Sequence, residues 1–172
     1  MIRNCLYVLS VLGLLSGCTQ KTPDGMPKLY PVAVTVTQDG SPLAGANVVL
    51  SGTDKWTPIG TTDAQGAASF YTQGNYPGVP EGTFKVSVIK ILEEGDKEPP
   101  KPFDAESERV YKEYMKSGKK FRQFNTTPEK YRSAETTPLS VEIKKGAKDI
   151  TVNVEGTVKD EIRQRGGVGA RR

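Results

Sequence analysis

From residue 31 onward the chain consists of short runs in which apolar and polar side chains alternate, and turns containing Gly, Asp or Pro separate the runs. Alternation with a period of two is typical of strands that bury one face. Several short strands separated by turns favour a sandwich over a parallel sheet with crossover helices. The sequence therefore predicts an all-β fold, a seven-strand, mainly antiparallel Greek-key β-sandwich over residues 30–155. The expected strands are residues 31–37, 46–50, 56–61, 67–71, 83–91, 139–143 and 149–154.

Turn residues and apolar positions give further expectations for this sandwich. Asp39-Gly40 is a strong hairpin signal. Asp63 is expected to cap its own turn, and Gly66 is expected to adopt a positive φ. The last two strands are expected to form a hairpin across residues 144–147. The most buried side chains should include Val34, Val36, Phe84, Val86, Val88, Val141 and Val152.

A highly charged insert, at about residues 92–138, interrupts the predicted strands, and residues 104–117 within it have the pattern of a helix. Asp104 suits the N-cap, and Phe103 before it could act as a hydrophobic staple. Glu108 and Lys112 are spaced as an i,i+4 ion pair. One helix is therefore expected in the insert.

The expected helix carries an apolar stripe, which consists of Val110, Tyr111, Tyr114 and Met115. Loops as long as this insert are usually functional or disordered, and open sheet edges need covering. We therefore expect Tyr111, Tyr114 and Met115 to pack against an edge or open end of the sandwich. The charged face should then point to solvent, with Arg109 and Lys112 as candidate partner contacts. The alternative is that the insert shields the edge and binds nothing.

The first 17 residues have the zones of a signal peptide, with a basic residue at Arg3 and an apolar run at residues 6–15. This run is shorter than the roughly 20 apolar residues of a membrane-spanning helix. The following sequence, LSGC at residues 15–18, resembles the lipobox of bacterial lipoproteins. The resemblance implies diacylglyceryl transfer to the Cys18 thiol, cleavage before Cys18 and acylation of the new amino group. A secretory signal with a chance cysteine and a transmembrane anchor are the alternatives.

Lipidation at Cys18 implies a protein held on a membrane of the cell envelope, because two or more acyl chains give stable anchoring. Residues 18–29 are polar and rich in turn residues, so they are expected to be a tether. Thr19, rather than Asp, follows the cysteine, which by resemblance to Gram-negative lipoproteins favours the outer membrane. Cys5 lies in the signal, so the mature domain would hold no disulfide.

Basic residues concentrate at the C-terminus, where residues 156–172 are expected to be a flexible tail. This segment has five basic and two acidic side chains, against a formal net charge of +4 for the whole chain. The rest of the mature chain is therefore close to neutral, which argues against a nucleic-acid partner.

The residue types needed for common hydrolytic sites are missing from the mature chain. It contains no histidine, and its one cysteine is the expected lipidation site, so zinc peptidase and Ser-His-Asp chemistry are not expected. The carboxylates of Glu93, Glu94, Asp96 and Glu98 lie in a Pro- and Lys-rich loop and are interpreted as a solvated surface. We therefore expect no enzyme activity, no metal site and no cofactor.

Three motifs, in this order and spacing, are similar to the carboxypeptidase regulatory-like domain, a transthyretin-like (prealbumin-type) sandwich. They are DGSPLAGANVVL at residues 39–50, GTTDAQGAASF at 60–70 and VPEGTFKVSVIK at 79–90. The stretch at residues 128–143 is similar to small envelope lipoproteins of planctomycete-type bacteria that carry this domain. The resemblance implies a β-sandwich and carries no peptidase activity with it.

The expected function is a non-catalytic binding or scaffolding module for an envelope protein or glycan. The alternative is a carbohydrate-binding accessory domain that uses exposed aromatic side chains, with Trp56 and Tyr76 as candidate partner contacts. Phe70 and Tyr71 alternate in direction, so at most some of these rings can be exposed. The competing interpretation places the aromatic residues in the core.

Overall fold

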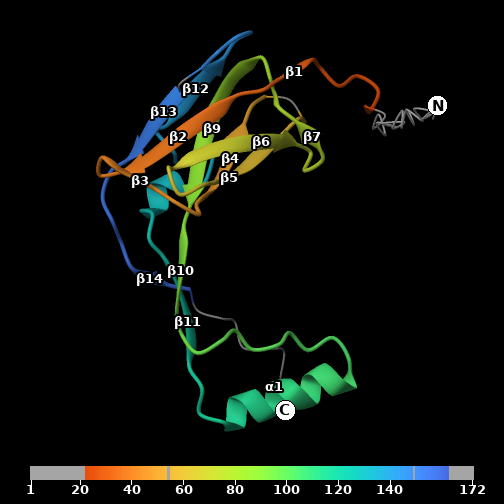
Figure 1. Ribbon diagram of the computed structural model, residues 1–172, viewed down its shortest axis with the longest axis vertical. Coiled ribbons are helices and arrows are strands. Elements are labelled where there is room, and N and C mark those ends of the chain that lie inside the picture. The colour runs from red at the N-terminus through yellow and green to blue at the C-terminus, as the bar shows by residue number, and fades with distance from the viewer. Residues whose placement is uncertain (1–21, 54, 149, 163–172) are drawn as a thin grey trace, which may run out of the picture.

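One sheet of nine strands forms the main body of the protein, which a computed structural model describes at residues 22–53, 55–148 and 150–162. Seven of its strands follow one another in the order β12-β9-β4-β5-β6-β2-β13 (Figure 1). They are β2 (Ala33–Gln38), β4 (Asn47–Ser51), β5 (Pro58–Thr62), β6 (Ala67–Thr72), β9 (Gly82–Ile89), β12 (Ser140–Ile143) and β13 (Ile150–Val154). These strands coincide with the seven predicted runs, and the all-β sandwich with one helix is confirmed.

Short elements complete this body, which we call the sandwich. β3 (Ser41–Pro42) pairs with β2, and β7 (Tyr76–Pro77) pairs with β6. β1 (Leu29–Tyr30) and β8 (Val79–Pro80) form a separate two-stranded sheet. A 3-10 helix, η1 (Glu129–Tyr131), contacts β9.

The core lies inside the curl of the sheet and follows the alternation seen in the sequence. In β2 the buried residues are Val34 and Val36, and in β9 Phe84, Val86 and Val88 are buried. None of the seven predicted core side chains is more than 6% exposed, so this prediction is confirmed. The sheet can therefore bend over one continuous apolar cluster, whose burial is the main stabilising contribution to a domain of this kind.

The two predicted turns form as expected. Asp39 and Gly40 both have positive φ, at 50° and 82°. Asp63 Oδ1 accepts hydrogen bonds of 2.9 Å from the backbone N–H groups of Gln65 and Ala67, and Gly66 has a φ of 77°. A side chain on Gly66 would place Cβ 2.5 Å from the Val36 carbonyl oxygen, so this turn requires glycine.

The predicted hairpin between the last two strands is wrong. The turn itself exists, with Ala147 N donating to Lys144 O at 2.9 Å, but β12 pairs antiparallel with β9 and β13 pairs parallel with β2. Because β9 and β2 would otherwise form the two edges of the sheet path, this arrangement covers both of them. A β12–β13 hairpin could pair with only one of these two edge strands and would leave the other open.

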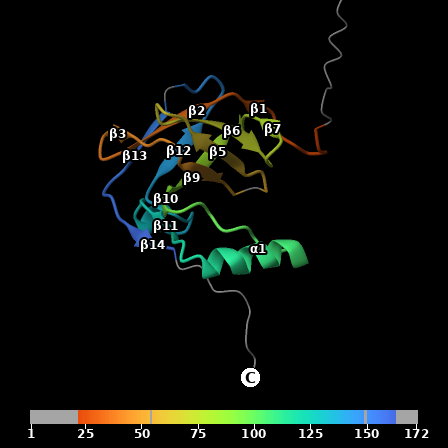
Figure 2. The same cartoon turned by 60° about the horizontal axis from the view of Figure 1, so that its bottom comes forward.

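The charged insert forms an arm that projects from the sandwich (Figures 1 and 2). β10 (Ile91–Gly95) pairs with β11 (Phe121–Asn125), and β11 pairs with β14 (Asp160–Glu161). The helix α1 (Ala105–Lys116) lies at the far end of the arm. We define the arm as residues 91–125 and 157–162.

Two expectations for this region are wrong. Helix α1 does not pack on the sandwich: it lies apart from it in both views and buries none of its residues. The segment from Gly156 to Ile162 is not a flexible tail, because it runs beside β11, with Val158 N donating to Thr126 O and Ile162 N donating to Gln123 O. The basic residues from 163 onward lie outside the described residues. No helix in the described part of the chain is long and apolar enough to cross a membrane.

Candidate partner-binding arm

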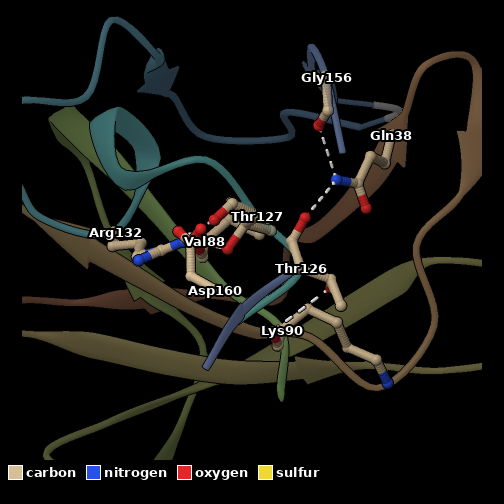
Figure 3. Close-up of polar contacts among 8 residues, drawn as sticks. All are labelled: Gln38, Val88, Lys90, Thr126, Thr127, Arg132, Gly156 and Asp160. Carbon is tan, nitrogen blue, oxygen red and sulfur yellow. Dashed lines mark hydrogen bonds and ion pairs between the residues drawn. The ribbon is translucent and has the colours of Figure 1, made fainter. Parts of the chain in front are cut away.

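The arm leaves the sandwich at a junction where three chain segments are tied together (Figure 3). The side chain of Gln38, from the end of β2, donates from Nε2 to Thr126 O at 3.0 Å and to Gly156 O at 2.8 Å. Thr126 N in turn donates to Lys90 O at 2.9 Å. One glutamine of the sandwich thus joins the segment that follows β11 to the segment that leads to β14.

A second set of bonds at the junction centres on Arg132, which follows η1. Its Nε donates to Thr127 O at 2.8 Å, and its guanidinium pairs with the Asp160 carboxylate of β14 (Figure 3). Thr127 is fully buried, and its hydroxyl donates to Val88 O at 3.1 Å. Arg132 therefore links the sandwich strand β9, through Thr127, to the arm strand β14.

Asp39 adds a third tie from the turn after β2. Its Oδ1 accepts a 2.7 Å hydrogen bond from Gly156 N, and its Oδ2 accepts one of 3.2 Å from the Thr157 hydroxyl. A carboxylate that accepts from a backbone N–H makes a stronger bond than a neutral acceptor does. The combined contacts fix the direction in which the arm leaves the sandwich.

The part of the arm next to the sandwich, which consists of β10, β11 and β14, is held together by strand pairing and by the side chain of Lys159. β10 and β11 pair from Ile91 opposite Asn125 to Gly95 opposite Phe121. Lys159, just before β14, pairs with Glu94 at 2.6 Å, and its Nζ lies 4.6 Å from the Phe124 ring centroid. Lys159 therefore links β10, through Glu94, to the ring of Phe124 in β11.

The helix at the tip begins and ends at the residues that the sequence predicts. Asp104 caps it by accepting from Ser107 N at 2.8 Å, and this hydrogen bond lowers the pKa of the Asp104 carboxyl. Glu108 and Lys112 pair at 2.8 Å, and this hydrogen bond and the lysine charge lower the pKa of Glu108. The Phe103 staple is wrong: that side chain is 87% exposed, because the N4 position that it would contact is Glu108 rather than an apolar residue.

The tyrosines of α1 pack within the arm rather than against the sandwich. Tyr111 lines a hollow of about 330 Å³ together with the proline-rich segment 98–102 and Gln123. Tyr114 is half-buried; desolvation and the nearby Asp96 charge raise the pKa of its hydroxyl. The predicted contact of Tyr111, Tyr114 and Met115 with the sandwich is therefore wrong, since the arm supplies its own apolar partner at residues 98–102.

The arm carries most of the exposed apolar surface. Five of the seven large hydrophobic side chains that are exposed in the described part of the chain belong to it, and these are Ile91, Leu92, Phe103, Val110 and Met115. The sequence pattern does not indicate this exposure for Ile91, the last residue of the best predicted strand, or for Leu92, the first residue of the charged insert. These side chains belong to β10, to the segment before α1 and to α1 itself, and such a concentration in one region is typical of an interaction surface.

The candidate site residues from the sequence are not brought together. Trp56 and Tyr76 belong to the sandwich, and Arg109 and Lys112 belong to the arm. Trp56 is only 7% exposed, so its expected role as an exposed stacking residue is wrong, while Tyr76 is half-buried in β7. Burial of Trp56 follows from its place just before β5, where alternation turns it toward the core side.

Arg109 and Lys112 are exposed, as expected, and each already pairs within the helix. Arg109 contacts Glu106 at 2.6 Å, and this contact raises the pKa of the guanidinium further. Cys18 lies outside the described residues. Within the described part of the chain, no three His, Cys, Asp or Glu residues are grouped as metal ligands.

Comparison with protein families, curated proteins and solved structures returned no match to this chain.

Proposed function

We propose that the protein is a cell-envelope lipoprotein, anchored to a membrane by lipid on Cys18, that acts as a non-catalytic binding or scaffolding module. Its sandwich is proposed to be a carboxypeptidase regulatory-like domain, on the motifs at residues 39–50, 60–70 and 79–90. Its arm is proposed to be the element that contacts an envelope partner. In a Gram-negative envelope, Thr19 favours the outer membrane.

The observation that carries the proposed binding role is the combination of exposed apolar side chains and a fixed support. The arm exposes Phe103, which is 87% accessible, and Met115, which is 59% accessible. Exposed apolar side chains that concentrate in one region of a protein are typical of a surface that a partner covers. A support whose direction is already fixed, here by Gln38, Arg132 and Asp39, loses less conformational entropy when a partner binds.

Anchoring is tested by substitution of the proposed lipidation site. A membrane fraction labelled with an alkyne fatty acid should carry label on the wild-type protein and none on Cys18→Ser. The Cys18→Ser protein should accumulate as a longer precursor or leave the membrane. Cys5→Ser is the matched control and should remain labelled, because Cys5 lies in the segment that is removed. Label that persists on Cys18→Ser, or a Cys18→Ser protein of mature length that stays on the membrane, would disprove the lipid anchor.

The arm is tested by site-specific photo-crosslinking in intact cells. A photoreactive residue at Phe103 or Met115 should give one discrete adduct, because these side chains are the most exposed apolar positions of the arm. The same residue at Thr151, an exposed position of β13, is the control and should give none. Identical adducts from all three positions, or none from the arm, would remove the arm as the contact element.

A further inference from the structure

We propose that the outer face of β5 and β6 around Tyr71 is a binding site for a neutral, N-acetylated glycan chain. This inference is independent of the arm, and it concerns the partner class that the sandwich itself could bind. Tyr71 is 50% exposed, which makes it the most exposed aromatic ring of the sandwich among the described residues.

Strand pairing places two rows of side chains on this face. In the first row, Tyr71 lies between Ile59 of β5 and Pro77 of β7. In the second row, Ser69 of β6 lies opposite Thr61. The rows are two residues apart along β6, about 7 Å, so hydroxyl groups lie one pleat away from an open aromatic ring. A pyranose ring has matching chemistry, because its C–H face can stack on an aromatic ring while its hydroxyls form hydrogen bonds at the rim.

Two shallow hollows meet at Tyr71 and Ser69. One, of about 540 Å³, is lined also by Thr61 and Asp63 and has the hydrogen-bonding groups. The other, of about 450 Å³, is lined on its apolar side by Val32, Ala33 and Pro77. Both hollows are mostly apolar and share Tyr71 and Ser69. The first adds the Thr61 hydroxyl and the Asp63 carboxylate, which suit sugar hydroxyls, and the second adds only apolar side chains, which suit the methyl group of an acetamido substituent.

Charge and backbone pairing favour a glycan over other occupants. Asp63 is the one charged side chain that lines either hollow, so nothing there would attract a phosphate or a nucleic acid. Its carboxylate is held in place by two backbone amides, which leaves Oδ2 available to accept from a sugar hydroxyl. The backbones of β5 and β6 are paired on both sides, so an extended peptide could not add to the sheet here.

The test is calorimetric titration of the full chain in detergent with chitohexaose, an oligomer of N-acetylglucosamine, and with cellohexaose, which lacks the acetamido groups. Chitohexaose should bind and cellohexaose should bind at least several-fold more weakly. Tyr71→Ala should weaken chitohexaose binding by about tenfold or more, whereas Tyr71→Phe keeps the ring and should bind within about threefold of wild type. Ser69→Ala should weaken binding less than Tyr71→Ala does. Purified peptidoglycan, tested by co-sedimentation, separates a cell-wall source from another N-acetylated polysaccharide.

Three outcomes would overturn this proposal. These are no binding of chitohexaose at millimolar concentration, equal binding by Tyr71→Ala and wild type, and equal binding of the two hexasaccharides. A change of oligomeric state in Tyr71→Ala without any sugar binding would instead make this face an interface between copies. Folding is checked by thermal unfolding, in which exposed Tyr71 variants should match wild type closely. Phe103→Ala on the arm is the matched control: it should leave sugar binding unchanged, so failure of the glycan site and failure of the arm remain distinguishable.

Discussion

Arg132 illustrates how one side chain decides the attachment of the arm. Its side chain is 20% exposed, and it satisfies the carbonyl oxygen of the fully buried Thr127 while pairing with Asp160. Arg132→Ala leaves that carbonyl without its partner, so we expect a loss of about 1–3 kcal/mol in the free energy of unfolding. Urea denaturation at neutral pH measures this loss.

Two variants separate the buried hydrogen bond from the ion pair. Asp160→Asn removes the charge of a side chain that is 54% exposed, and should cost no more than about 1 kcal/mol. Arg132→Lys keeps the charge but lacks the fork that reaches both partners, and should behave more like Arg132→Ala. If Asp160→Asn costs as much as Arg132→Ala, the ion pair rather than the Thr127 contact stabilises the junction.

At the residue scale, the sequence predicts the alternating core and not the junction. Val34 and Val86 could be assigned to the core because a period of two depends only on neighbouring residues. Gln38, Arg132 and Asp160 are polar residues with no local pattern around them. The contacts of Gln38 join segments 88 and 118 residues apart, and Arg132 pairs with Asp160 across 28 residues. The buried Tyr131 was equally undetectable, since it stands alone in a polar segment.

At the element scale, helix α1 depends on its capping carboxylate, and this makes it sensitive to acid. The pKa of Asp104 is lowered from 3.8, mainly by the hydrogen bond from Ser107 N. A lowered folded-state pKa means that the stabilising contribution is complete above pH 3.8 and is lost as the pH falls through the lower, folded-state value. The helical signal in far-UV circular dichroism should therefore fall in this acid range.

Asp104→Asn tests the origin of this acid sensitivity, because asparagine caps a helix about as well as aspartate and does not titrate. The variant should keep its helical signal at neutral pH and lose less of it on acidification than wild type does. Glu108→Gln, which removes the pair with Lys112, is the comparison for the other shifted carboxylate. Identical acid titrations of Asp104→Asn and wild type would show that the cap is not responsible.

Among the elements of the arm, helix α1 could be predicted from the sequence, whereas strands β10 and β11 could not. The cap and the i,i+4 pair are both local signals, and both are present in the structure. β10 and β11 are rich in charged and amide side chains, so they lack the alternation of a half-buried strand. Their pairing is decided by the junction at Lys90 and Thr126, which no local pattern reveals.

At the scale of the whole molecule, the tip of the arm, which we define as residues 96–120, contributes no residue to the core of the sandwich. The docking of α1 was predicted from its apolar stripe, but a stripe does not specify which surface covers it. The proline-rich segment at residues 98–102 meets Tyr111 instead. The consequence is a fold in which none of the residues from 96 to 120 is buried.

This separation predicts that the tip can be removed while the sandwich stays intact. Gly95 pairs with Phe121 and has a φ of 96°, so replacing residues 96–120 by Asn-Gly should close β10 and β11 into a tight hairpin. Because no core residue is removed, the free energy of unfolding should change by less than about 1 kcal/mol. The deletion should also abolish the arm crosslinks, and it should leave sugar binding at Tyr71 unchanged.

A longer deletion provides the contrast that makes this prediction decisive. Removing residues 96–127 also removes the Thr126 contact to Gln38 and the buried Thr127 hydroxyl that donates to Val88. This deletion also removes β11 with the buried Phe124, so β10 and β14 lose their pairing partner. The Val88 carbonyl loses its Thr127 donor, while Gln38 keeps Gly156 and Arg132 keeps Asp160 as their remaining partners. Because an unsatisfied buried group alone costs about 1–3 kcal/mol, and the strand pairing of β11 is lost as well, the longer deletion should be markedly less stable in urea than the shorter one. Equal stability of the two deletions would mean that the junction does not hold the arm to the sandwich, and a large loss from the shorter one would mean that the tip contributes to the core.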